Sequence, residues 1–367
     1  MTADVIAPTT PLFTGDLPEH TRQILDDAPA PGTQCDLGLI PSPGELLSLH
    51  QAMLLGRTVE SAATNLATQG HLAVYPAARG QEACQVGAAA ALRSSDWLFP
   101  TYRDSIAVIT RGADPAEVLV GFQGLRHLGY DPYTHRTAPL CTPLATHAPH
   151  AVGLAHAARY RDDDTVALVL LGEGATSEGD FHAALNFAAV FAAPVVFMIQ
   201  NNQYAISVPA HRQSAARSFA HKGIGYGVPA ERVDGNDILA VLLTVRAAVE
   251  QARAGAGPML IEAVTYRVGP HTSSDDAARY RPAGEADPWQ RHDPLERFSA
   301  YLHRHGLVTE PAAAAAARSC DAVVDDLRAR LMAPTVSDPT DLTAHVYTDP
   351  PGHLLAQTAA LASEEED

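Results

Sequence analysis

The 367-residue sequence predicts an α/β fold, in which a mainly parallel sheet has helices on both faces and a helical region follows at the C-terminus. Two short apolar runs, 165–171 (TVALVLL) and 195–199 (VVFMI), are typical of buried parallel strands. Between them a helical pattern of apolar residues ends before Pro194, which predicts a strand, helix, strand unit. The polar loops 172–177 and 200–205 follow the two strands, at the sheet edge where such folds bind ligands.

Further elements follow from the same periodicity. Amphipathic helices are expected over 45–68, ended by Gly70, and over 237–254. Residues 80–92 predict a helix whose small side chains let another helix pack closely. Ser177 and Asp180 fit the N-cap and N3 positions of a capping box. Strands are expected over 230–233 and 259–264, and helices over 289–306 and 310–332.

The domain organisation predicted is one large domain, residues 46–335, with an extension at each end. Residues 1–45 contain seven prolines and no sustained period, which indicates an N-terminal arm that becomes ordered against a partner. Residues 336–367 form a C-terminal tail, and its acidic end, residues 364–367, should be solvated.

Composition excludes several classes of protein. The formal net charge of −17 argues against a nucleic-acid or anionic-membrane surface. Four scattered cysteines without metal spacing suit reduced thiols in a cytoplasmic enzyme, and no signal peptide is recognisable. The longest apolar stretch, residues 183–199, is interrupted by Asn186 and Pro194, so no membrane span is expected.

The two loops carry ligands for a hard cation. Glu173 follows the first strand with a carboxylate, and Asn202 follows the second with an amide oxygen. Such oxygens suit Mg²⁺, which commonly shares phosphate oxygens of a bound ligand. Gly174 would let the backbone approach a diphosphate, and the following helix offers its positive end. A plain capped turn remains an alternative. A dinucleotide site is disfavoured because its third glycine would be Ser177, and no GxxxxGK[ST] phosphate loop occurs.

The G-E-G of residues 172–174, followed by the N-N of 201–202, resembles the thiamine-diphosphate motif. The fuller strings GEGATSEGD and NNQYAIS resemble the alpha subunit of the thiamine-diphosphate-dependent 2-oxo acid dehydrogenase component, most of all the bacterial branched-chain (2-oxoisovalerate, 3-methyl-2-oxobutanoate) type. Most of the wider superfamily has Asp at the position of Glu173, whereas branched-chain subunits can carry Glu. The resemblance spans residues 45–335. It implies the thiamine-diphosphate-binding fold and oxidative decarboxylation of a 2-oxo acid, with acyl transfer to a lipoyl domain.

The resemblance also implies a set of site residues. Mg²⁺ would be held by Glu173, Asn202 and the carbonyl of Tyr204, and His271 would act at the reacting end of thiamine diphosphate. The rest of the cofactor would contact Tyr102, Arg103, Thr142, Leu144, Gly172, Gly174 and Ala175.

Four positions depart from the pattern of the family. Cys141 and His147 stand where Ser and Gln commonly help to hold a potassium ion, and sulfur is a poor ligand for a hard cation, so K⁺ is left open. Gln200 replaces an Arg that reaches the diphosphate in animal enzymes. Thr272 stands where the animal enzymes have a phosphorylated Ser.

The partners implied are a beta subunit, in an α₂β₂ heterotetramer, and a lipoylated acyltransferase component. The glutamate that activates the other ring of the cofactor would come from the beta subunit. A pyruvate dehydrogenase alpha subunit is the alternative within the class, because GPHT, DPLERF and HLAVYPAARGQEA occur in similar form in pyruvate enzymes. A nucleotide-dependent oxidoreductase and a non-catalytic scaffold subunit are alternatives outside it.

Overall fold

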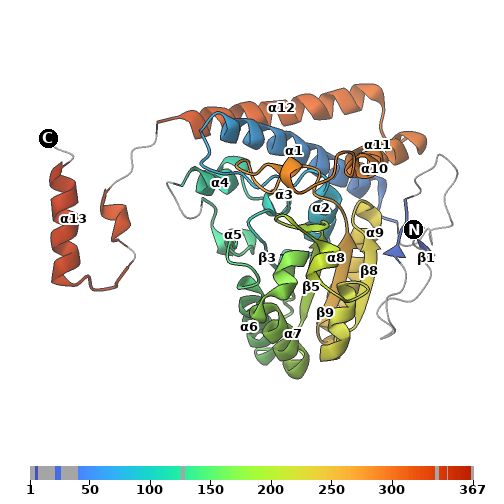
Figure 1. Ribbon diagram of the computed structural model, residues 1–367, viewed down its shortest axis with the longest axis horizontal. Coiled ribbons are helices and arrows are strands. Elements are labelled where there is room, and N and C mark those ends of the chain that lie inside the picture. The colour runs from blue at the N-terminus through green and yellow to red at the C-terminus, as the bar shows by residue number, and fades with distance from the viewer. Residues whose placement is uncertain are drawn as a thin grey trace.

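One parallel sheet organises the chain (Figure 1). The computed structural model describes residues 5–6, 21–25, 40–124, 129–334, 339–344 and 346–364. Its strands pair in the order β1-β2-β8-β9-β5-β4-β3, and every pairing within that order is parallel. The strands are β1 (Val5–Ile6), β2 (Thr21–Arg22), β3 (Trp97–Phe99), β4 (Ala167–Gly172), β5 (Val195–Asn201), β8 (Ala230–Asp234) and β9 (Met259–Val264). The predicted fold class is confirmed.

The central strands are apolar along their whole length because both faces of the sheet are covered. In β4, Leu168 and Leu170 point into one hydrophobic cluster, whereas Val169 and Leu171 point into another on the opposite face. All four side chains are fully buried. The sequence therefore shows a continuous apolar run here and not an alternation of apolar and polar residues.

Helices cover both faces. One cluster lies beneath α1 (Pro43–Thr68), α2 (Glu82–Ala90), α3 (Ser105–Thr110), α9 (Ile238–Gln251) and α11 (Pro294–Arg304). The other lies beneath α6 (His147–Tyr160), α7 (Gly179–Phe191) and η3 (Ala220–Tyr226). The remaining elements are α4 (Pro115–Leu119), η1 (Val120–Gln123), α5 (Pro132–His135), η2 (Glu173–Ser177), β6 (Tyr204–Ala205), β7 (Val208–Pro209), α8 (Ala210–Gln213), η4 (Ala252–Ala256), η5 (Ala277–Arg279), α10 (Asp287–Arg291), α12 (Glu310–Met332), η6 (Pro339–Leu342) and α13 (Gly352–Glu364).

The small-sided helix α2 packs directly against α9, as its composition predicts. A Cβ atom built on Gly87 would lie 3.0 Å from Cγ1 of Val241 and 3.2 Å from the carbonyl oxygen of Ile238. A larger side chain at this position would push the two helices apart. The alanine-rich sequence of α2 is therefore explained by close packing.

Two predicted boundaries are wrong. Helix α7 begins at Gly179, its N-cap is Glu178, and no side chain caps it. Ser177 instead ends the 3₁₀ turn η2, and its hydroxyl accepts a hydrogen bond from Gln213. The single helix expected over 289–306 is two helices, α10 and α11. Asp293 caps the second one, and Pro294 at its first position cannot continue the preceding turn.

The expected arm, residues 1–45, lies largely outside the described residues, but two short pieces of it add strands β1 and β2 to the sheet edge. The backbone N–H groups of Ile24 and Leu25 both donate to the Asp237 carboxylate. The proline-rich composition did not indicate these strands. Residues 365–367 of the acidic end also lie outside the described part.

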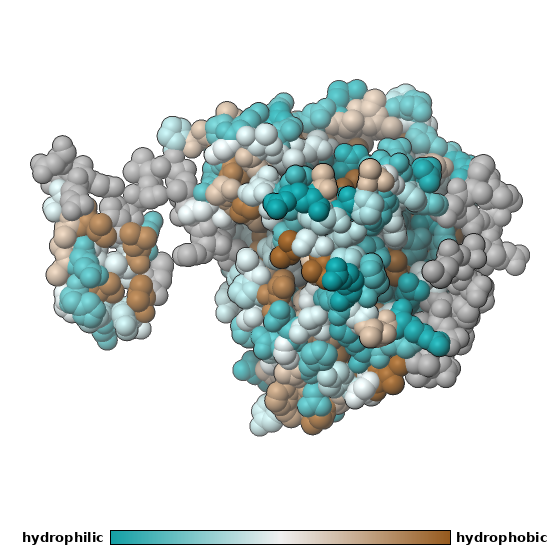
Figure 2. All heavy atoms as spheres, in the orientation of Figure 1, coloured by the Kyte–Doolittle hydropathy of each residue, from teal (hydrophilic) through white to brown (hydrophobic). Residues whose placement is uncertain are grey.

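At the C-terminus, α12 lies along α1, whereas α13 stands away from the sheet and its helices (Figure 1). Figure 2 shows apolar side chains on the outside of this segment. In the same segment the side chains of Leu342, Tyr347 and Leu355 are each more than half exposed. The tail, residues 336–367, thus contains an unpredicted helix with exposed apolar side chains.

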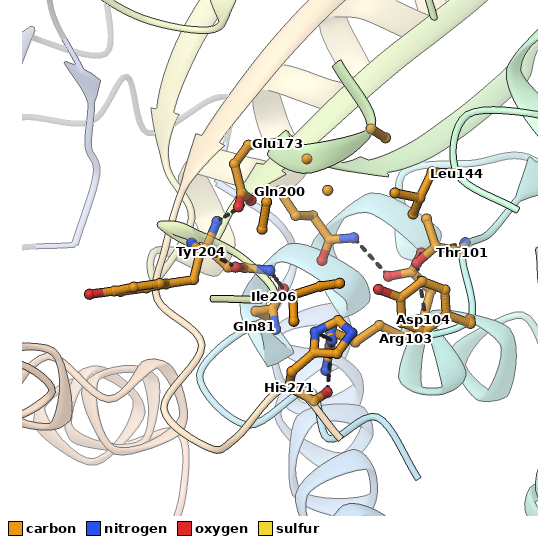
Figure 3. Close-up of a pocket in the computed structure, with 16 residues that line it drawn as sticks. Gln81, Thr101, Arg103, Asp104, Leu144, Glu173, Gln200, Tyr204, Ile206 and His271 are labelled. Carbon is orange, nitrogen blue, oxygen red and sulfur yellow. Dashed lines mark hydrogen bonds between the residues drawn. The ribbon is translucent and has the colours of Figure 1, made fainter. Parts of the chain in front are cut away.

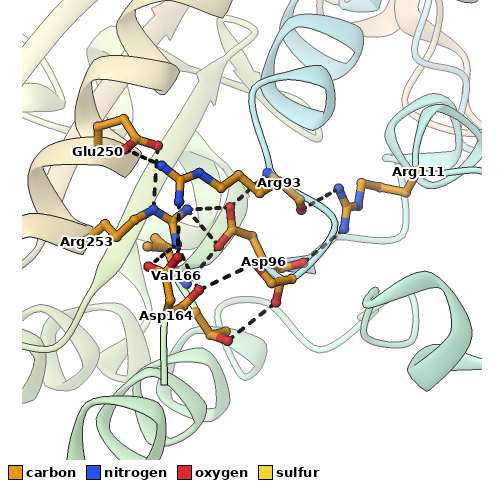
Figure 4. A network of polar contacts seen from close by, with 9 residues as sticks. Arg93, Asp96, Arg111, Asp164, Val166, Glu250 and Arg253 are labelled. Carbon is orange, nitrogen blue, oxygen red and sulfur yellow. Dashed lines mark hydrogen bonds and ion pairs between the residues drawn. The ribbon is translucent and has the colours of Figure 1, made fainter. Parts of the chain in front are cut away.

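At the amino ends of β3 and β4, a buried carboxylate fixes the loops (Figure 4). Both oxygens of Asp96 accept hydrogen bonds from Nη2 of Arg253, at 2.9 and 2.8 Å. The same carboxylate accepts from the backbone N–H groups of Arg93 and Val166. This ion pair joins η4, which follows α9, to the starts of β3 and β4, at the sheet edge opposite to the predicted site.

Candidate active site

A cavity of about 140 Å³ opens at the carboxyl ends of β4 and β5 (Figure 3). All the site residues named from the sequence line it except Thr142. They are Tyr102, Arg103, Leu144, Gly172, Glu173, Gly174, Ala175, Asn202, Tyr204 and His271. The structure therefore brings residues from five separate segments together at the predicted edge of the sheet.

Glu173 lies at the start of η2 with its side chain buried. One carboxylate oxygen, Oε2, accepts the backbone N–H of Asn202 at 3.1 Å, which joins the loop after β4 to the loop after β5. The other, Oε1, is buried and has no hydrogen-bond partner among the described residues. Burial raises the pKa of this carboxyl group to about 7, although the Asn202 N–H and the charges of Arg267 and Arg103 oppose the rise. A cation at Oε1 would offset the free-energy cost of burying the ionised carboxylate.

Asn202 and Tyr204 are held by a tight turn. Gln203 and Ile206 have φ angles of 75° and 55°, in the left-handed region, so the chain reverses and turns its polar groups inward. The Asn202 side-chain oxygen accepts the Tyr204 N–H at 3.3 Å, and its amide nitrogen donates to Gln81. The side chains of Glu173 and Asn202 thus face the same cavity.

The donor set fits a magnesium ion that shares oxygens with a bound diphosphate. It comprises one carboxylate, one amide oxygen and one carbonyl, and all three are hard ligands. Across the described residues there is no cluster of three His, Cys, Asp or Glu side chains that could hold a metal on its own. The Tyr204 carbonyl also accepts a hydrogen bond of 3.2 Å from Nη1 of Arg267. That guanidinium lowers the electron density available to a metal at the same oxygen.

Gly174 has a packing role in the loop. A Cβ atom there would lie 3.0 Å from the Cβ of Ala205, so the missing side chain lets η2 approach β6. At Gly172 a Cβ would meet nothing within 4 Å. The glycine that the geometry requires is therefore Gly174.

Arg103 is buried and reaches toward His271, which lies on the loop between β9 and η5, residues 265–276, called the histidine loop below (Figure 3). Its Nη1 donates to the Ala77 carbonyl at 2.6 Å, and its Nη2 lies 3.0 Å from both the carbonyl oxygen and Nδ1 of His271. Arg103 is therefore not a solvated surface residue. The Tyr102 ring lies edge-on to the His271 ring at 6.1 Å.

His271 is held in its neutral form. Its Nδ1 faces two guanidinium groups, Arg103 at 3.0 Å and Arg267 at 3.3 Å, and these groups can only donate. Nδ1 therefore accepts, and the proton of the ring lies on Nε2. Burial and the two arginine charges lower the pKa of His271 to about 4, and the opposing effect of Asp275 is smaller. The imidazole of His271, which lines the cavity, therefore carries its N–H group on Nε2.

Arg267 is a site residue that the sequence did not reveal. It is almost fully buried, and Nη2 donates to the Ile206 carbonyl and to the Tyr280 hydroxyl. Burial, followed by the nearby charge of Arg103, lowers the pKa of its guanidinium. Through its bonds to Tyr204 and His271, Arg267 joins the loop that follows β5 to the histidine loop. In the sequence, the only indication of this role is the position of Arg267 four residues before His271.

Thr142 lies beside a second cavity of about 490 Å³ that adjoins the first. Tyr102, Leu144, Ile206 and His271 border both cavities. The lining of the larger one is mainly apolar and includes Val118, Phe122, Tyr130 and Leu140. His271 thus borders a cavity lined by several charged and amide residues and another lined mainly by apolar residues.

The sequence departures have structural counterparts. The Cys141 thiol donates to the Pro143 carbonyl, and His147 Nε2 bonds the Leu170 carbonyl at 2.7 Å. Burial lowers the pKa of His147, so it is a neutral donor. These contacts join Cys141 and His147 to backbone carbonyls of the same loop and of β4, and they do not test the K⁺ site. Gln200 donates to Asp104 at 2.7 Å and leaves its own oxygen buried without a described partner.

Comparison with known proteins agrees with this geometry. Residues 50–334 match the model of the family described as "Dehydrogenase E1 component". Over 316 residues, 86% of each chain, the sequence is 47% identical to the 3-methyl-2-oxobutanoate dehydrogenase subunit alpha of Mycobacterium tuberculosis. It is 39% identical to the 2-oxoisovalerate dehydrogenase subunit alpha of Bacillus subtilis over 72% of this chain and 84% of that one. It is also 39% identical to the pyruvate dehydrogenase E1 component subunit alpha of Acholeplasma laidlawii, over 72% and 77%. None of the helices in the described residues is long and apolar enough to span a membrane.

Proposed function

The chain belongs to the dehydrogenase E1 component family, and from this premise we propose that it is the alpha subunit of a branched-chain 2-oxo acid dehydrogenase. It takes part in the oxidative decarboxylation of 2-oxo acids of the 3-methyl-2-oxobutanoate class, with transfer of the acyl group to a lipoyl domain. The observation that carries the proposal is the convergence of the thiamine-diphosphate motif residues on one cavity at the carboxyl edge of the sheet.

Thiamine diphosphate and Mg²⁺ are the cofactors in this proposal. When bound, thiamine diphosphate supplies the electron sink for decarboxylation, and the protein supplies binding, orientation and electrostatics. Glu173, Asn202 and the Tyr204 carbonyl would hold the metal. The support is the buried Oε1 of Glu173, which has no partner in the described structure, in a cavity that also contains an unpartnered amide nitrogen of Gln81. Such orphaned groups are costly unless a ligand meets them.

The remaining site residues have assigned roles in the proposal. Tyr102, Arg103, Gly172, Gly174 and Ala175 would contact the diphosphate, and Thr142 and Leu144 would lie near the middle of the cofactor. Arg103 already uses some of its N–H groups on Ala77 and His271, so it would meet the phosphate through the others. His271, with its proton on Nε2, would donate a hydrogen bond at the reacting centre.

A beta subunit would complete the site in an α₂β₂ heterotetramer, and a lipoylated acyltransferase would accept the product. Among the described residues two carboxylates line the cavity, Glu173 and Asp104. The Asp104 carboxylate already accepts hydrogen bonds from Thr101 and Gln200. The carboxylate for the other ring of the cofactor would therefore come from the partner. Phe187 and Val190 on α7 are exposed apolar side chains of the kind that a partner subunit would cover.

The proposed preference for branched-chain substrates rests on the size of the second cavity and on its apolar lining. The cavity of about 490 Å³ next to His271 is lined mainly by apolar side chains, which suits a branched acyl group. Relatives named for pyruvate are also similar to this chain, so pyruvate remains the alternative. A nucleotide-dependent oxidoreductase is disfavoured by Ser177 and by membership of the family. A non-catalytic scaffold subunit would not bind the cofactor.

Calorimetric titration of thiamine diphosphate, with Mg²⁺, into the reconstituted alpha–beta complex tests the cofactor assignment. Glu173→Ala and Asn202→Ala should each weaken binding by at least about tenfold, because each removes a metal ligand. Val324→Ala, a core substitution at a residue that does not line the cavity, is the control and should bind normally. Unchanged affinity in both site variants would refute the metal assignment, and no binding by the wild-type complex would favour a scaffold.

A further inference from the structure

A buried carboxylate lies close to the site without lining its cavity. Glu60, in α1, is 3% exposed and is not among the residues that border the cavity. Its Oε1 accepts the Tyr75 hydroxyl at 2.6 Å, and its Oε2 accepts the backbone N–H of Ala78 at 2.9 Å. Tyr75 belongs to a hydrophobic cluster that also contains Val59 and Ala63 of α1. The reaction proposed above gives this carboxylate no role.

The segment that Glu60 holds, residues 75–79, contacts the histidine loop at both ends. At one end, Ser273 donates its backbone N–H to the Tyr75 carbonyl at 3.0 Å, and its hydroxyl accepts the Tyr75 N–H at 3.2 Å. At the other end, Val268 donates its N–H to the Arg79 carbonyl at 3.2 Å. His271 therefore lies on a stretch that is fixed to residues 75–79 on either side.

The same segment also positions Arg103. The Ala77 carbonyl accepts Nη1 of Arg103 at 2.6 Å, and Nη2 of the same guanidinium bonds the carbonyl and Nδ1 of His271. Because Glu60 binds residues 75 and 78, on either side of Ala77, a shift of its carboxylate would move that carbonyl. Glu60 is thus connected to the imidazole through the backbone of residues 77–78 and the side chain of Arg103.

A purely structural role would not require a carboxylate here. Burial, with a smaller contribution from the nearby Glu82, raises the pKa of Glu60 to about 7, although the hydrogen bonds from Tyr75 and Ala78 and the charge of Arg103 lower it. Burying such a group costs free energy that an apolar side chain of similar size would not. Its two oxygens, however, fix two points of an irregular segment with defined geometry.

We propose that Glu60 is a positioning residue for His271, and that it acts by holding residues 75–78 against Arg103 and the histidine loop. The importance of His271 for the reaction rests on the proposed function; the mechanical link from Glu60 to the loop does not.

The test uses the reconstituted alpha–beta complex and three variants. Glu60→Met removes both acceptors at nearly constant volume, whereas Glu60→Gln can still accept from Ala78 and donate to the Tyr75 oxygen. Val324→Ala removes methyl groups from the same hydrophobic cluster as Tyr75 without touching a polar contact, and so controls for lost stability.

For Glu60→Met we expect kcat to fall by at least about tenfold, with KM for the 2-oxo acid and cofactor affinity changed less than about threefold, because orientation is lost and binding is kept. The Glu60→Gln complex should keep most of the wild-type kcat, and the Val324→Ala complex should have the wild-type kcat. A Glu60→Met complex with wild-type kcat would overturn the proposal, as would an equal loss of kcat in Val324→Ala.

Hydrogen exchange separates this proposal from the proposed function. In Glu60→Met, the amides of Val268 and Ser273 should exchange at least about tenfold faster than in the wild type, whether or not the complex decarboxylates any substrate. Unchanged exchange at both amides would overturn the positioning role. A wild-type complex without thiamine-dependent activity would instead refute the proposed function.

Discussion

The neutral state of His271 can be tested through Arg103. A displacement of the pKa from 6.5 to about 4 corresponds to roughly 3 kcal/mol for a fully buried group. Because the ring is only partly buried, solvent screening reduces this to roughly 1–2 kcal/mol. Arg103→Gln removes the nearer of the two charges and should raise the pKa of His271 to between about 5 and 6, with Arg267 keeping it below the ordinary value.

The assay is an NMR titration of the reconstituted complex with ¹³C-labelled histidine, in which the missing signal of His271→Gln assigns the resonance. The folded-state pKa is lowered, so the stabilisation from the neutral ring is complete above pH 6.5 and is lost as the pH falls toward 4. Arg93→Gln, at the opposite edge of the sheet, should leave the pKa unchanged. A wild-type pKa between about 6 and 7, or no change in Arg103→Gln, would refute the reasoning.

Three further predictions concern stability of the full chain. Gly87→Ala should lower the free energy of unfolding by about 1–3 kcal/mol in urea denaturation, since a Cβ there overlaps α9, whereas Gly153→Ala, where a Cβ meets nothing, should raise it by up to about 1 kcal/mol. Arg253→Met should cost about 3–5 kcal/mol, because it leaves the buried carboxylate of Asp96 without its charged partner. His147→Gln should flatten the loss of stability as the pH falls below 6.5, because the lowered pKa of the wild-type imidazole makes its protonation unfavourable in the folded state.

Each of these has a clear contrary result. Equal stability changes at the two glycines would show that the α2–α9 contact is not tight. A loss below about 1 kcal/mol at Arg253 would show that the ion pair behaves like an exposed one. An unchanged pH profile in His147→Gln would show that another group controls acid unfolding.

The fold and the location of the site could be predicted from the sequence because the strands are apolar along their length. Parallel strands buried on both faces leave long apolar runs, and polar loops must then follow them at a common edge. Glu173 and Asn202 were therefore expected to lie near each other, and the structure places them so.

Other features depend on contacts that the local sequence does not encode. Ser177 and Asp180 have the spacing of a capping box, but Ser177 is the last residue of η2, and α7 begins only at Gly179. Arg267 and Glu60 act through partners distant in sequence, so neither stands out locally. Strand β2 pairs with β8, β1 pairs with β2, and the residues after β2 bond to Asp237; these contacts outweigh the proline-rich composition around the two strands.

The most direct test of the central claim is the steady-state rate of decarboxylation by the reconstituted alpha–beta complex, with an artificial electron acceptor. With thiamine diphosphate and Mg²⁺, kcat/KM for 3-methyl-2-oxobutanoate should exceed that for pyruvate by at least about tenfold, because additional methyl groups fill the apolar cavity. The alpha chain alone should show no activity. A preference for pyruvate would contradict the branched-chain assignment, and activity that does not require thiamine diphosphate would contradict the whole account.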